Sequence, residues 1–337
     1  MTNFTRRAAL GMAGGAAVLP LLGSPALANT KLTVGALRFT SHAASFVAYE
    51  RGYFTDEGLD VEFKFFEAAQ PMAVAIASQD ADFGVTSITG GLISLAEKGA
   101  AKVIAGALSE EKGIDGQMIL ASNAAYDAGL TAPAALDGKS FAVTQPGSSF
   151  HYMGAKIAEA EGVSLSYKPL QKVGAIIGAM KSGQVDAWTI VPHIGKALTG
   201  GGAVKQIGMV ADYLPGYQVT TVFTSAKNAS EDRAKTEAFL RAFSRGADDF
   251  NAALVDKTVD AAQQEEMVKL IHKYVYEDQP FEKASTSIIN GAMRINKDGA
   301  LNMGSVNDQV DWFKSEGLIK GSITVDTLVD TSYVELT

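Results

Sequence analysis

Four short segments hold most of the polar side chains that could contact a ligand, and each follows a run of strand-like residues. They span residues 38–42, 86–89, 144–149 and 190–193, and they offer hydroxyls and imidazoles but no carboxylate. In open α/β sheets, ligands bind beyond the carboxyl ends of the strands, so we expect these segments to surround one site. The candidate binding residues in and beside them are Arg38, Thr40, Ser41, His42, Thr86, Ser87, Thr89, Gly147, Ser148, Ser149, His151, Trp188, His193 and Tyr217.

The segments 38–42 and 144–149 each lead into a predicted helix. Unpaired backbone N–H groups at a helix N-terminus, together with the helix dipole, favour an anion. Ser148 and Ser149 fit this arrangement as ligand contacts, although N-capping alone would also explain serine there. Arg38 suits a carboxylate or sulfonate through a bidentate contact, or it faces solvent as a free charge. The pattern therefore favours a small acidic ligand.

Three of the four histidines, His42, His151 and His193, lie in or beside these segments, whereas His272 lies in a later predicted helix. A metal site would need carboxylates or cysteines at ligand spacing, and none accompanies them. We therefore predict no metal and no other cofactor. An imidazole can donate a hydrogen bond from either ring nitrogen, so we expect these histidines to contact an acidic ligand. The alternative for each is a surface imidazole with no part in binding.

Aromatic side chains near the segments could hold the apolar part of a ligand. Trp188 lies in a predicted strand, and Tyr217 lies just before another. Ring stacking would suit a ligand with an aromatic group, whereas core packing is the alternative for a strand residue. For Phe39 and Phe150 we expect core packing.

The elements that position these segments form an internal repeat with an offset of 104 residues. Glu57-Gly58 recurs as Glu161-Gly162, and Asp82 recurs as Asp186. Each copy predicts three strands, with a helix after the first and after the second. The strands are predicted at 32–37, 59–66, 82–85, 140–143, 164–170 and 186–190, and the helices at 43–57, 71–78, 147–161 and 173–182. This alternation predicts two matched α/β units with parallel sheets; one long α/β domain is the alternative.

Two extended runs, 117–121 and 218–225, flank the second copy and predict strands that carry the chain into a second lobe and back. Two crossings would form a hinge. Helical patterns at 232–251, 259–276, 282–293 and 306–316 predict helices that complete the first lobe. We therefore predict that residues 29–117 and 225–337 form the first lobe and residues 118–224 the second.

Three stretches carry a resemblance to a known family. They are AYERGYFTDEGLDV at residues 48–61, LDGKSFAV at 136–143 followed by Gly147-Ser148-Ser149, and MKSGQVDA at 180–187 followed by Pro192. With these stretches the chain resembles the periplasmic binding proteins for nitrate, sulfonates, taurine and thiamine-pyrimidine precursors. The resemblance implies the type II periplasmic-binding-protein fold, in which two α/β lobes surround a ligand cleft and are joined by a two-strand hinge. It also implies a small-molecule ligand and, as partners, the membrane permease subunits of an ABC importer.

Residues 1–28 are typical of a twin-arginine signal peptide. Arg6 and Arg7 precede a weakly apolar stretch, and the small-x-small sequence Ala26-Leu27-Ala28 follows it as a cleavage site. A membrane helix is the alternative, but the stretch at 8–22 is short and contains three glycines and a proline. We therefore expect a soluble protein in the periplasm that begins at Asn29.

Charge and composition exclude several classes of partner and chemistry. The net charge is −8 and no basic run occurs, which argues against nucleic acid and anionic membranes as partners. The chain has no cysteine, and therefore no disulfide, thiolate metal ligand or thiol nucleophile. Enzymes that share the scaffold of the resembled family use cysteines, and no G-x-S-x-G motif occurs here. We predict a monomer that is not an enzyme.

These observations predict a small organic anion, an aromatic carboxylate or sulfonate, bound between two lobes. A neutral pyrimidine-type precursor and nitrate are the alternative ligands. An exported subunit that senses a ligand for a membrane receptor is the alternative role. We expect ligand binding to close the lobes about residues 117–121 and 218–225, because a shared site binds the closed state preferentially.

Overall fold

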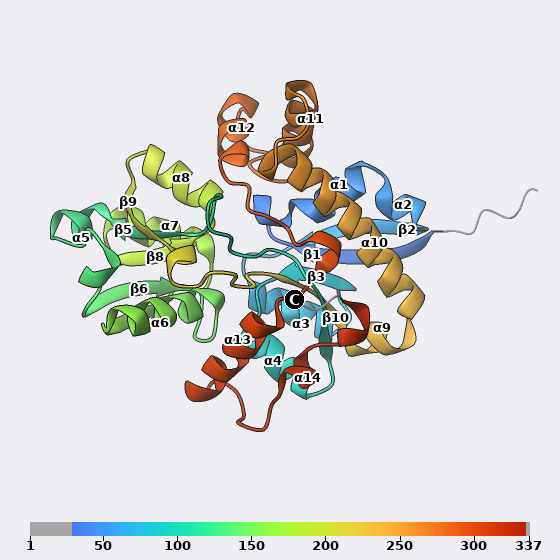
Figure 1. The fold of residues 1–337 in the computed structure, drawn as a ribbon, viewed down its shortest axis with the longest axis horizontal. Coiled ribbons are helices and arrows are strands. Elements are labelled where there is room, and N and C mark those ends of the chain that lie inside the picture. The colour runs from blue at the N-terminus through green and yellow to red at the C-terminus, as the bar shows by residue number, and fades with distance from the viewer. Residues whose placement is uncertain (1–28, 335–337) are drawn as a thin grey trace, which may run out of the picture.

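The computed structural model describes residues 29–334, so the predicted signal peptide at 1–28 lies outside the described residues. Two five-stranded sheets form the centres of two lobes that lie side by side. In Figure 1 the second lobe is the green and yellow half, and the first lobe combines the blue elements with the orange and red C-terminal helices. The two matched α/β units predicted from the repeat are therefore present.

The first sheet has the strand order β2-β1-β3-β10-β4. β1 pairs in parallel with β2 and β3, whereas β10 lies antiparallel between β3 and β4. β3 and β10 are buried along their whole length, as expected for inner strands with helices on both faces of the sheet. The strands are β1 Thr30–Ala36, β2 Leu59–Phe65, β3 Phe83–Thr86, β4 Ala101–Gly106 and β10 Thr221–Ser225.

The second sheet repeats this topology with the order β7-β6-β8-β5-β9. β6 pairs in parallel with β7 and β8, and β5 lies antiparallel between β8 and β9. The offset of the repeat superimposes β8 on β3 along the chain. The strands are β5 Met118–Ser122, β6 Lys139–Val143, β7 Leu165–Pro169, β8 Ala187–Ile190 and β9 Val204–Met209.

The two runs that we expected to cross between the lobes are members of the sheets instead. The run at 117–121 is largely β5, in the second sheet, and the run at 218–225 contains β10, in the first. Residues 221–224, assigned to the second lobe from the sequence, therefore pair within the first sheet. The physical reason is that every residue of β5 and β10 is buried, and a sheet satisfies the backbone groups of a buried strand on both sides.

The chain crosses between the lobes through residues 107–117 and 210–220, here called the crossing segments. They run beside each other and are joined by backbone hydrogen bonds. Val219 N donates to Leu108 O at 2.8 Å, and Glu110 N donates to Tyr217 O at 2.9 Å. This two-stranded connection is where a hinge between the lobes would bend.

Helices cover both sheets, and most begin and end within a few residues of their predicted positions. The predicted helix at 43–57 is interrupted at Gly52, where φ is 74°, and the one predicted at 147–161 begins at Ser149 because Gly147 has a φ of 73°. The first lobe holds α1 Ala43–Glu50, α2 Tyr53–Asp56, α3 Ala69–Ala77, α4 Gly90–Glu97, α9 Ala226–Glu231, α10 Arg233–Phe250, α11 Ala261–His272, α12 Phe281–Ile289, α13 Met303–Ser315 and α14 Val325–Leu328. The second lobe holds α5 Asn123–Asp127, α6 Ser149–Glu161, α7 Val173–Ser182 and α8 Pro192–Gly200.

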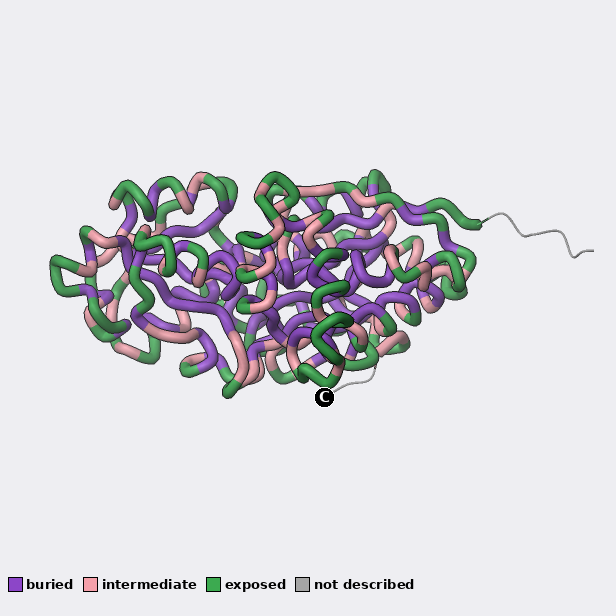
Figure 2. The backbone as a smooth tube through the Cα atoms, turned by 90° about the horizontal axis from the view of Figure 1, so that it is seen from above, coloured by how far each residue is buried: buried purple, intermediate pink, exposed green. Residues whose placement is uncertain are grey.

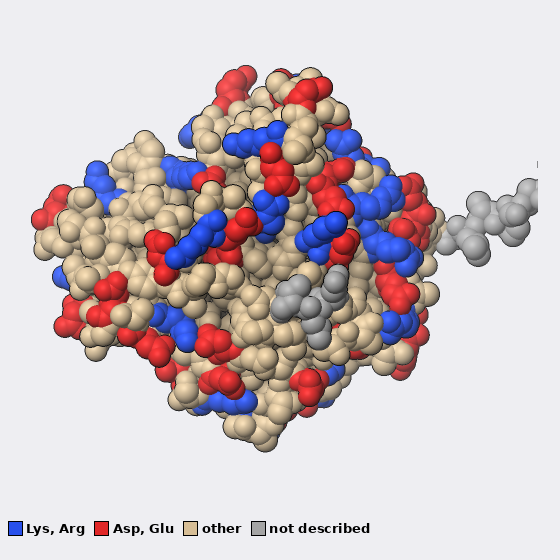
Figure 3. Space-filling view, viewed as in Figure 1, with Lys and Arg blue, Asp and Glu red and all other residues tan. Residues whose placement is uncertain are grey.

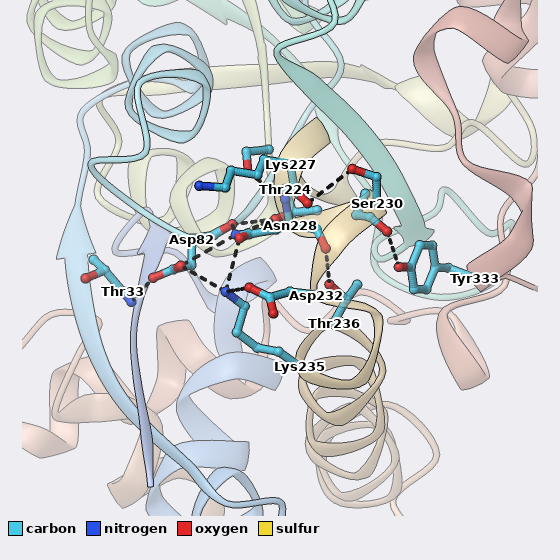
Figure 4. A network of polar contacts seen from close by, with 12 residues as sticks. Thr33, Asp82, Thr224, Lys227, Asn228, Ser230, Asp232, Lys235, Thr236 and Tyr333 are labelled. Atoms are coloured by element: carbon cyan, nitrogen blue, oxygen red, sulfur yellow. Dashed lines mark hydrogen bonds and ion pairs between the residues drawn. The ribbon is translucent and has the colours of Figure 1, made fainter.

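The repeated aspartates Asp82 and Asp186 have the same structural role in both lobes. The Asp82 carboxylate accepts a hydrogen bond from Thr33 N at 2.8 Å, and the Asp186 carboxylate accepts one from Ser140 N, also at 2.8 Å. Figure 4 shows the network around Asp82, in which Thr224 donates to the Asp82 carbonyl at 2.6 Å. Each aspartate therefore joins neighbouring strands of its sheet.

Apolar side chains fill the space between sheets and helices in both lobes. Figure 2 shows buried segments running through the centre of each lobe and exposed segments at the outer turns. In the first lobe, the ring of Phe83 stacks on that of Phe239 with 4.1 Å between centroids. α10 approaches α1 closely at Gly246, where a Cβ atom would lie 2.2 Å from Ala44 O. Among residues 29–334, no helix combines the length and apolar character that crossing a membrane requires.

The charged side chains are distributed over the surface rather than gathered by sign. On the face drawn in Figure 3, acidic and basic side chains alternate. Many form ion pairs, such as Arg294 with Glu111 and Asp256 at 2.6 and 2.9 Å. This face therefore offers no extended basic surface of the kind that binds nucleic acid.

Candidate ligand-binding site

A cavity lies where the two lobes meet, and we call it the inner cavity. It encloses about 60 Å³, on the order of a few water molecules. No lining side chain is an aspartate, glutamate, lysine or arginine. Its polar lining consists of Ser41, His42, Gln70, Thr86, Ser87, Thr89, Gln117, Thr144, Gln145, Ser148, Ser149 and Thr220.

Six helices begin at the inner cavity, three from each lobe. α1, α3 and α4 reach it from the first lobe, and α6, α7 and α8 reach it from the second. Each has at least eight residues and lines the cavity with its N-cap or first residue. These terminal residues are His42, Ala69, Thr89, Ser149, Val173 and Val191. The positive ends of six helix dipoles therefore favour negative charge at this place.

The hydroxyls of the inner cavity fall into two groups. Those of Thr89 and Ser148 cap helices: Thr89 accepts from Leu92 N at 3.0 Å, and Ser148 accepts from the backbone of His151 at 3.4 Å. In the described part of the chain, five lining hydroxyls form no hydrogen bond: those of Ser41, Thr86, Ser87, Thr144 and Ser149. These five can donate to a ligand without breaking an existing bond. At the start of α6, Ser148 therefore caps the helix, whereas the hydroxyl of its neighbour Ser149 is available.

The lobes are closed around the inner cavity. Gly90 N, at the start of α4, donates to Gly147 O across the cleft at 3.0 Å. Farther out, the hydroxyl of Tyr276 lies 2.8 Å from Nδ1 of His193. Near the opposite rim, Lys156 pairs with Asp308 at 3.0 Å. A ligand in the inner cavity would therefore be enclosed by both lobes.

His42 and His193 lie in opposite lobes and are both buried and neutral. Burial lowers the pKa of His42 to about 3, and Leu37 N donates to its Nδ1 at 3.3 Å. Because Nδ1 accepts, the proton of the neutral ring is on Nε2, which is then a donor. Burial, with a smaller effect of His42, lowers the pKa of His193 to about 3. Both rings act as uncharged hydrogen-bonding groups, and the described residues contain no group of three potential metal ligands.

Half of the residues predicted for the site line the inner cavity, and half do not. Ser41, His42, Thr86, Ser87, Thr89, Ser148 and Ser149 line it. The seven that do not are Arg38, Thr40, Gly147, His151, Trp188, His193 and Tyr217. Thr40 is fully buried behind the cavity, and the ring of His151 packs against Tyr167 and Trp312.

The expected stacking of a ligand on Trp188 and Tyr217 is wrong. Trp188 is completely buried and packs edge-on against Phe150 at 5.5 Å. Tyr217 is 2% exposed and packs against Tyr152 at 5.1 Å. Both rings belong to the core of the protein, which is the alternative that the sequence had left open for a strand residue.

Arg38 does not reach the inner cavity either. Its guanidinium pairs with Glu277 at 3.0 Å and lies 4.0 Å above the ring of Phe65. The side chain is therefore partnered and half exposed at the edge of the cleft. An acidic group in the inner cavity would be held by neutral donors.

Several lining residues were absent from the predicted site. Gln70 lies at the start of α3, Val173 at the start of α7, and Gln117 and Thr220 in the crossing segments. The first two follow β2 and β7, so the rule that ligands bind beyond the carboxyl ends of strands would have found them had it been applied to these strands. No sequence pattern marks Gln117 and Thr220 as lining residues, because their position at the cavity depends on how the crossing segments join the two lobes.

Comparison with known proteins identifies a family by sequence and a fold by structure. A family model described as NMT1/THI5 like matches residues 39–253, more than half of the chain. No relative is detected among curated proteins.

Solved structures of similar shape cover nearly the whole chain. The ligand-binding component of an ABC-type import system from Staphylococcus aureus, with zinc bound, is 12% identical with a TM-score of 0.70, covering 90% of this chain and 98% of its own. The alkanesulfonate-binding protein SsuA from Xanthomonas axonopodis pv. citri, bound to MOPS, is 16% identical with a TM-score of 0.68, covering 93% and 100%. The nitrate-binding protein NrtA from Synechocystis PCC 6803 is 15% identical with a TM-score of 0.68, covering 89% and 84%. These likenesses confirm the predicted periplasmic-binding-protein fold.

Proposed function

The chain belongs to the NMT1/THI5-like family. We propose that it is the periplasmic substrate-binding component of an ABC importer for a small organic anion. The observation that carries the proposal is the convergence of six helix N-termini on an inner cavity without charged side chains. We favour an aromatic carboxylate or sulfonate as the ligand class. Proteins of the same fold that are named for alkanesulfonate and for nitrate support an oxyanion head group.

Neutral donors are sufficient to hold such a head group. Hydrogen bonds to an ionised acceptor are roughly twice as strong as those between neutral groups. The hydroxyls of Ser41 and Ser87 come from the first lobe and that of Ser149 from the second. Because these contacts exist together only when the lobes meet, the ligand stabilises the closed state. Closure would bend the crossing segments.

Nitrate is the second candidate, because an inner cavity of about 60 Å³ suits a very small anion. A neutral pyrimidine-type precursor gains less from the helix N-termini, since their dipoles favour negative charge. An exported sensing subunit would bind its ligand in the same way. Uptake of the identified ligand by a deletion strain that expresses the permease constitutively separates import from sensing, because uptake is then lost only if the protein is a subunit of the importer.

Binding, rather than catalysis, is also the better account of the polar groups present. In residues 29–334, no seryl or threonyl hydroxyl of the inner cavity is hydrogen-bonded to an imidazole. A serine nucleophile needs such a base. The sequence has no cysteine to act instead.

A thermal-shift screen followed by calorimetry tests the proposal directly. Methanesulfonate, benzenesulfonate, benzoate, nitrate and a hydroxymethylpyrimidine represent the competing ligand classes. A ligand at one hundred times its Kd stabilises the folded state by about 2.7 kcal/mol. We expect stabilisation by the organic acids. Stabilisation by the pyrimidine alone, or by nitrate alone, would replace the proposed ligand class.

The double variant Ser148→Ala with Ser149→Ala should bind the preferred acid more weakly. Two hydroxyls at the N-terminus of α6 are lost, and a hydrogen bond to a charged group contributes about 1–3 kcal/mol, or roughly 5- to 150-fold in Kd. Ser122→Ala is the matched control: Ser122 also caps a helix of the second lobe, accepting from Ala125 N at 3.2 Å, but does not line the cavity. Calorimetry should show wild-type affinity for this control. Equal affinity of the double variant and the wild type would refute the anion site.

A further inference from the structure

A second and larger cavity adjoins the inner cavity, and we call it the outer cavity. It encloses about 440 Å³, against about 60 Å³ for the inner one. Leu37, Phe39 and Val173 line both cavities, so the two are neighbours that share these residues as a common wall. The outer cavity also lies between the lobes, with α7 and α8 on one side and residues of the first lobe on the other.

The lining of the outer cavity differs from that of the inner one. Apolar side chains predominate, among them Phe65, Phe66, Ile177, Ile194 and Leu198. Three cations, Arg38, Lys181 and Lys283, lie around it with a single carboxylate, Glu67. The outer cavity is thus an apolar compartment with an excess of positive charge.

His193 lies in the wall of this compartment. Its side chain lines the outer cavity and is 1% exposed. Nδ1 is bonded to the Tyr276 hydroxyl, whereas Nε2 has no hydrogen-bond partner within the described residues. A buried polar atom without a partner is costly unless something else satisfies it. The edge of Phe39 packs against this ring, with 5.5 Å between centroids.

The two volumes bear on where an organic ligand can fit. An inner cavity of about 60 Å³ is much smaller than the roughly 150 Å³ of a cavity that binds benzene, so it suits an acidic head group rather than a ring or a chain. Trp188 and Tyr217, the rings expected to hold the apolar part, are buried away from the cavity. The adjoining apolar space is the outer cavity, whose volume is in the range of about 300–1,000 Å³ typical of small-molecule sites.

We propose that the outer cavity is a second compartment of the binding site, and that the ligand is an organic acid whose apolar body extends past Phe39 into it. The inference rests on the proposed function, because the head group occupies the inner cavity. The ligand class is an acid with an aliphatic chain or aromatic body too large for the inner cavity alone. Both lobes wall the outer cavity, so the body also adds contacts that favour closure.

A series of straight-chain sulfonates from methanesulfonate to octanesulfonate, with benzenesulfonate and 2-naphthalenesulfonate, tests this assignment by calorimetry. Burial of each methylene should tighten binding about fourfold until the outer cavity is filled. The aromatic sulfonates should bind more tightly than methanesulfonate. An affinity independent of body size would overturn the proposal.

Gly174 offers a way to fill the outer cavity without disturbing the fold. It lines this cavity from α7, and a Cβ atom built there meets no atom within 4 Å. Gly174→Trp should weaken octanesulfonate and 2-naphthalenesulfonate at least tenfold and leave methanesulfonate unchanged. Gly178→Trp is the matched control, because Gly178 lies one turn farther along α7, also has no atom within 4 Å of a Cβ, and does not line the cavity.

Ile177→Trp repeats the test from another lining position of α7. It keeps the test decisive if the side chain introduced by Gly174→Trp points to solvent. If both filling variants bind the long and short sulfonates like the wild type, the outer cavity is not part of the site. If short sulfonates bind with no gain from a longer body, this inference fails and the proposed function stands. If no acid of the series binds, both fail.

Discussion

Gly291→Ala should hold the cleft open and weaken ligand binding about 5- to 150-fold. Gly291 follows α12 in the first lobe and lies directly against His193 at the start of α8 in the second. A Cβ atom at Gly291 would lie 2.2 Å from Cβ, 2.4 Å from Cα and 2.6 Å from N of His193. Because two of these atoms are backbone, no side-chain rotation relieves the clash. Overpacking of this kind costs about 1–3 kcal/mol, which the closed state alone would bear.

Small-angle scattering and calorimetry together measure this effect. With the tightest-binding sulfonate, the radius of gyration of the wild type should fall as the lobes close, whereas that of Gly291→Ala should not change. The free energy of unfolding should stay near the wild-type value, because the open state relieves the clash. Gly178→Ala, where the added Cβ meets nothing within 4 Å, is the control. Contraction and tight binding by the Gly291 variant would show that closure does not need this contact.

The sequence predicted the sheets well because strand and helix patterns depend on local burial. The repeat with its offset of 104 residues located the first three strands of each unit. Asp82 and Asp186 occupy equivalent positions in the two copies, because each forms a hydrogen bond to a neighbouring strand of its sheet. The pattern did not reveal that each sheet takes its antiparallel strand from the chain as it crosses between lobes. That pairing joins β10 to β3 and β4 across more than one hundred residues, and no local pattern records such a partner.

The binding site was harder to predict than the fold for a related reason. Loops at the carboxyl ends of strands could be found by rule, and Ser41, Thr86 and Ser149 in these loops line the inner cavity. The direction of a side chain on a strand depends on register, and Trp188 turned out to face the core. Whether a residue lines the inner or the outer cavity depends on how the lobes meet, which sequence patterns do not contain.

Glu110→Gln should remove a pH-dependent loss of stability that originates in the hinge. Glu110 lies in the first crossing segment and is 2% exposed. Its Oε1 accepts from Gln117 N at 3.0 Å, whereas its Oε2 is buried with no hydrogen-bond partner within the described residues. Burial raises the pKa of Glu110 from 4.5 to about 7, although the hydrogen bond from Gln117 N opposes this. The nearby phenol of Tyr217 is itself buried, and the charge of Glu110 helps to raise its pKa.

The sign of the effect follows from the pKa of Glu110 in the unfolded chain, 4.5, and its pKa in the folded protein, about 7. Between pH 4.5 and about 7 the folded protein binds more protons than the unfolded chain, so the free energy of unfolding falls as the pH rises through this window. The loss is complete above pH 7 and on the order of 2–4 kcal/mol. His42 and His193, whose pKa values are lowered to about 3, act in the opposite sense, because stability falls as the pH drops below about 6.5. Their contribution is common to wild type and variant and cancels in the difference.

Urea unfolding at pH 5 and pH 8 isolates the contribution of Glu110. The variant should match the wild type within about 1 kcal/mol at pH 5, where most of the effect is absent, and exceed it by on the order of 2–4 kcal/mol at pH 8. Glu231→Gln, an exposed carboxyl at the end of α9, controls for the loss of one negative charge. A difference that is the same at both pH values would mean that Glu110 is ionised throughout. In that case the crossing segments would carry a buried charge at every pH at which the protein works.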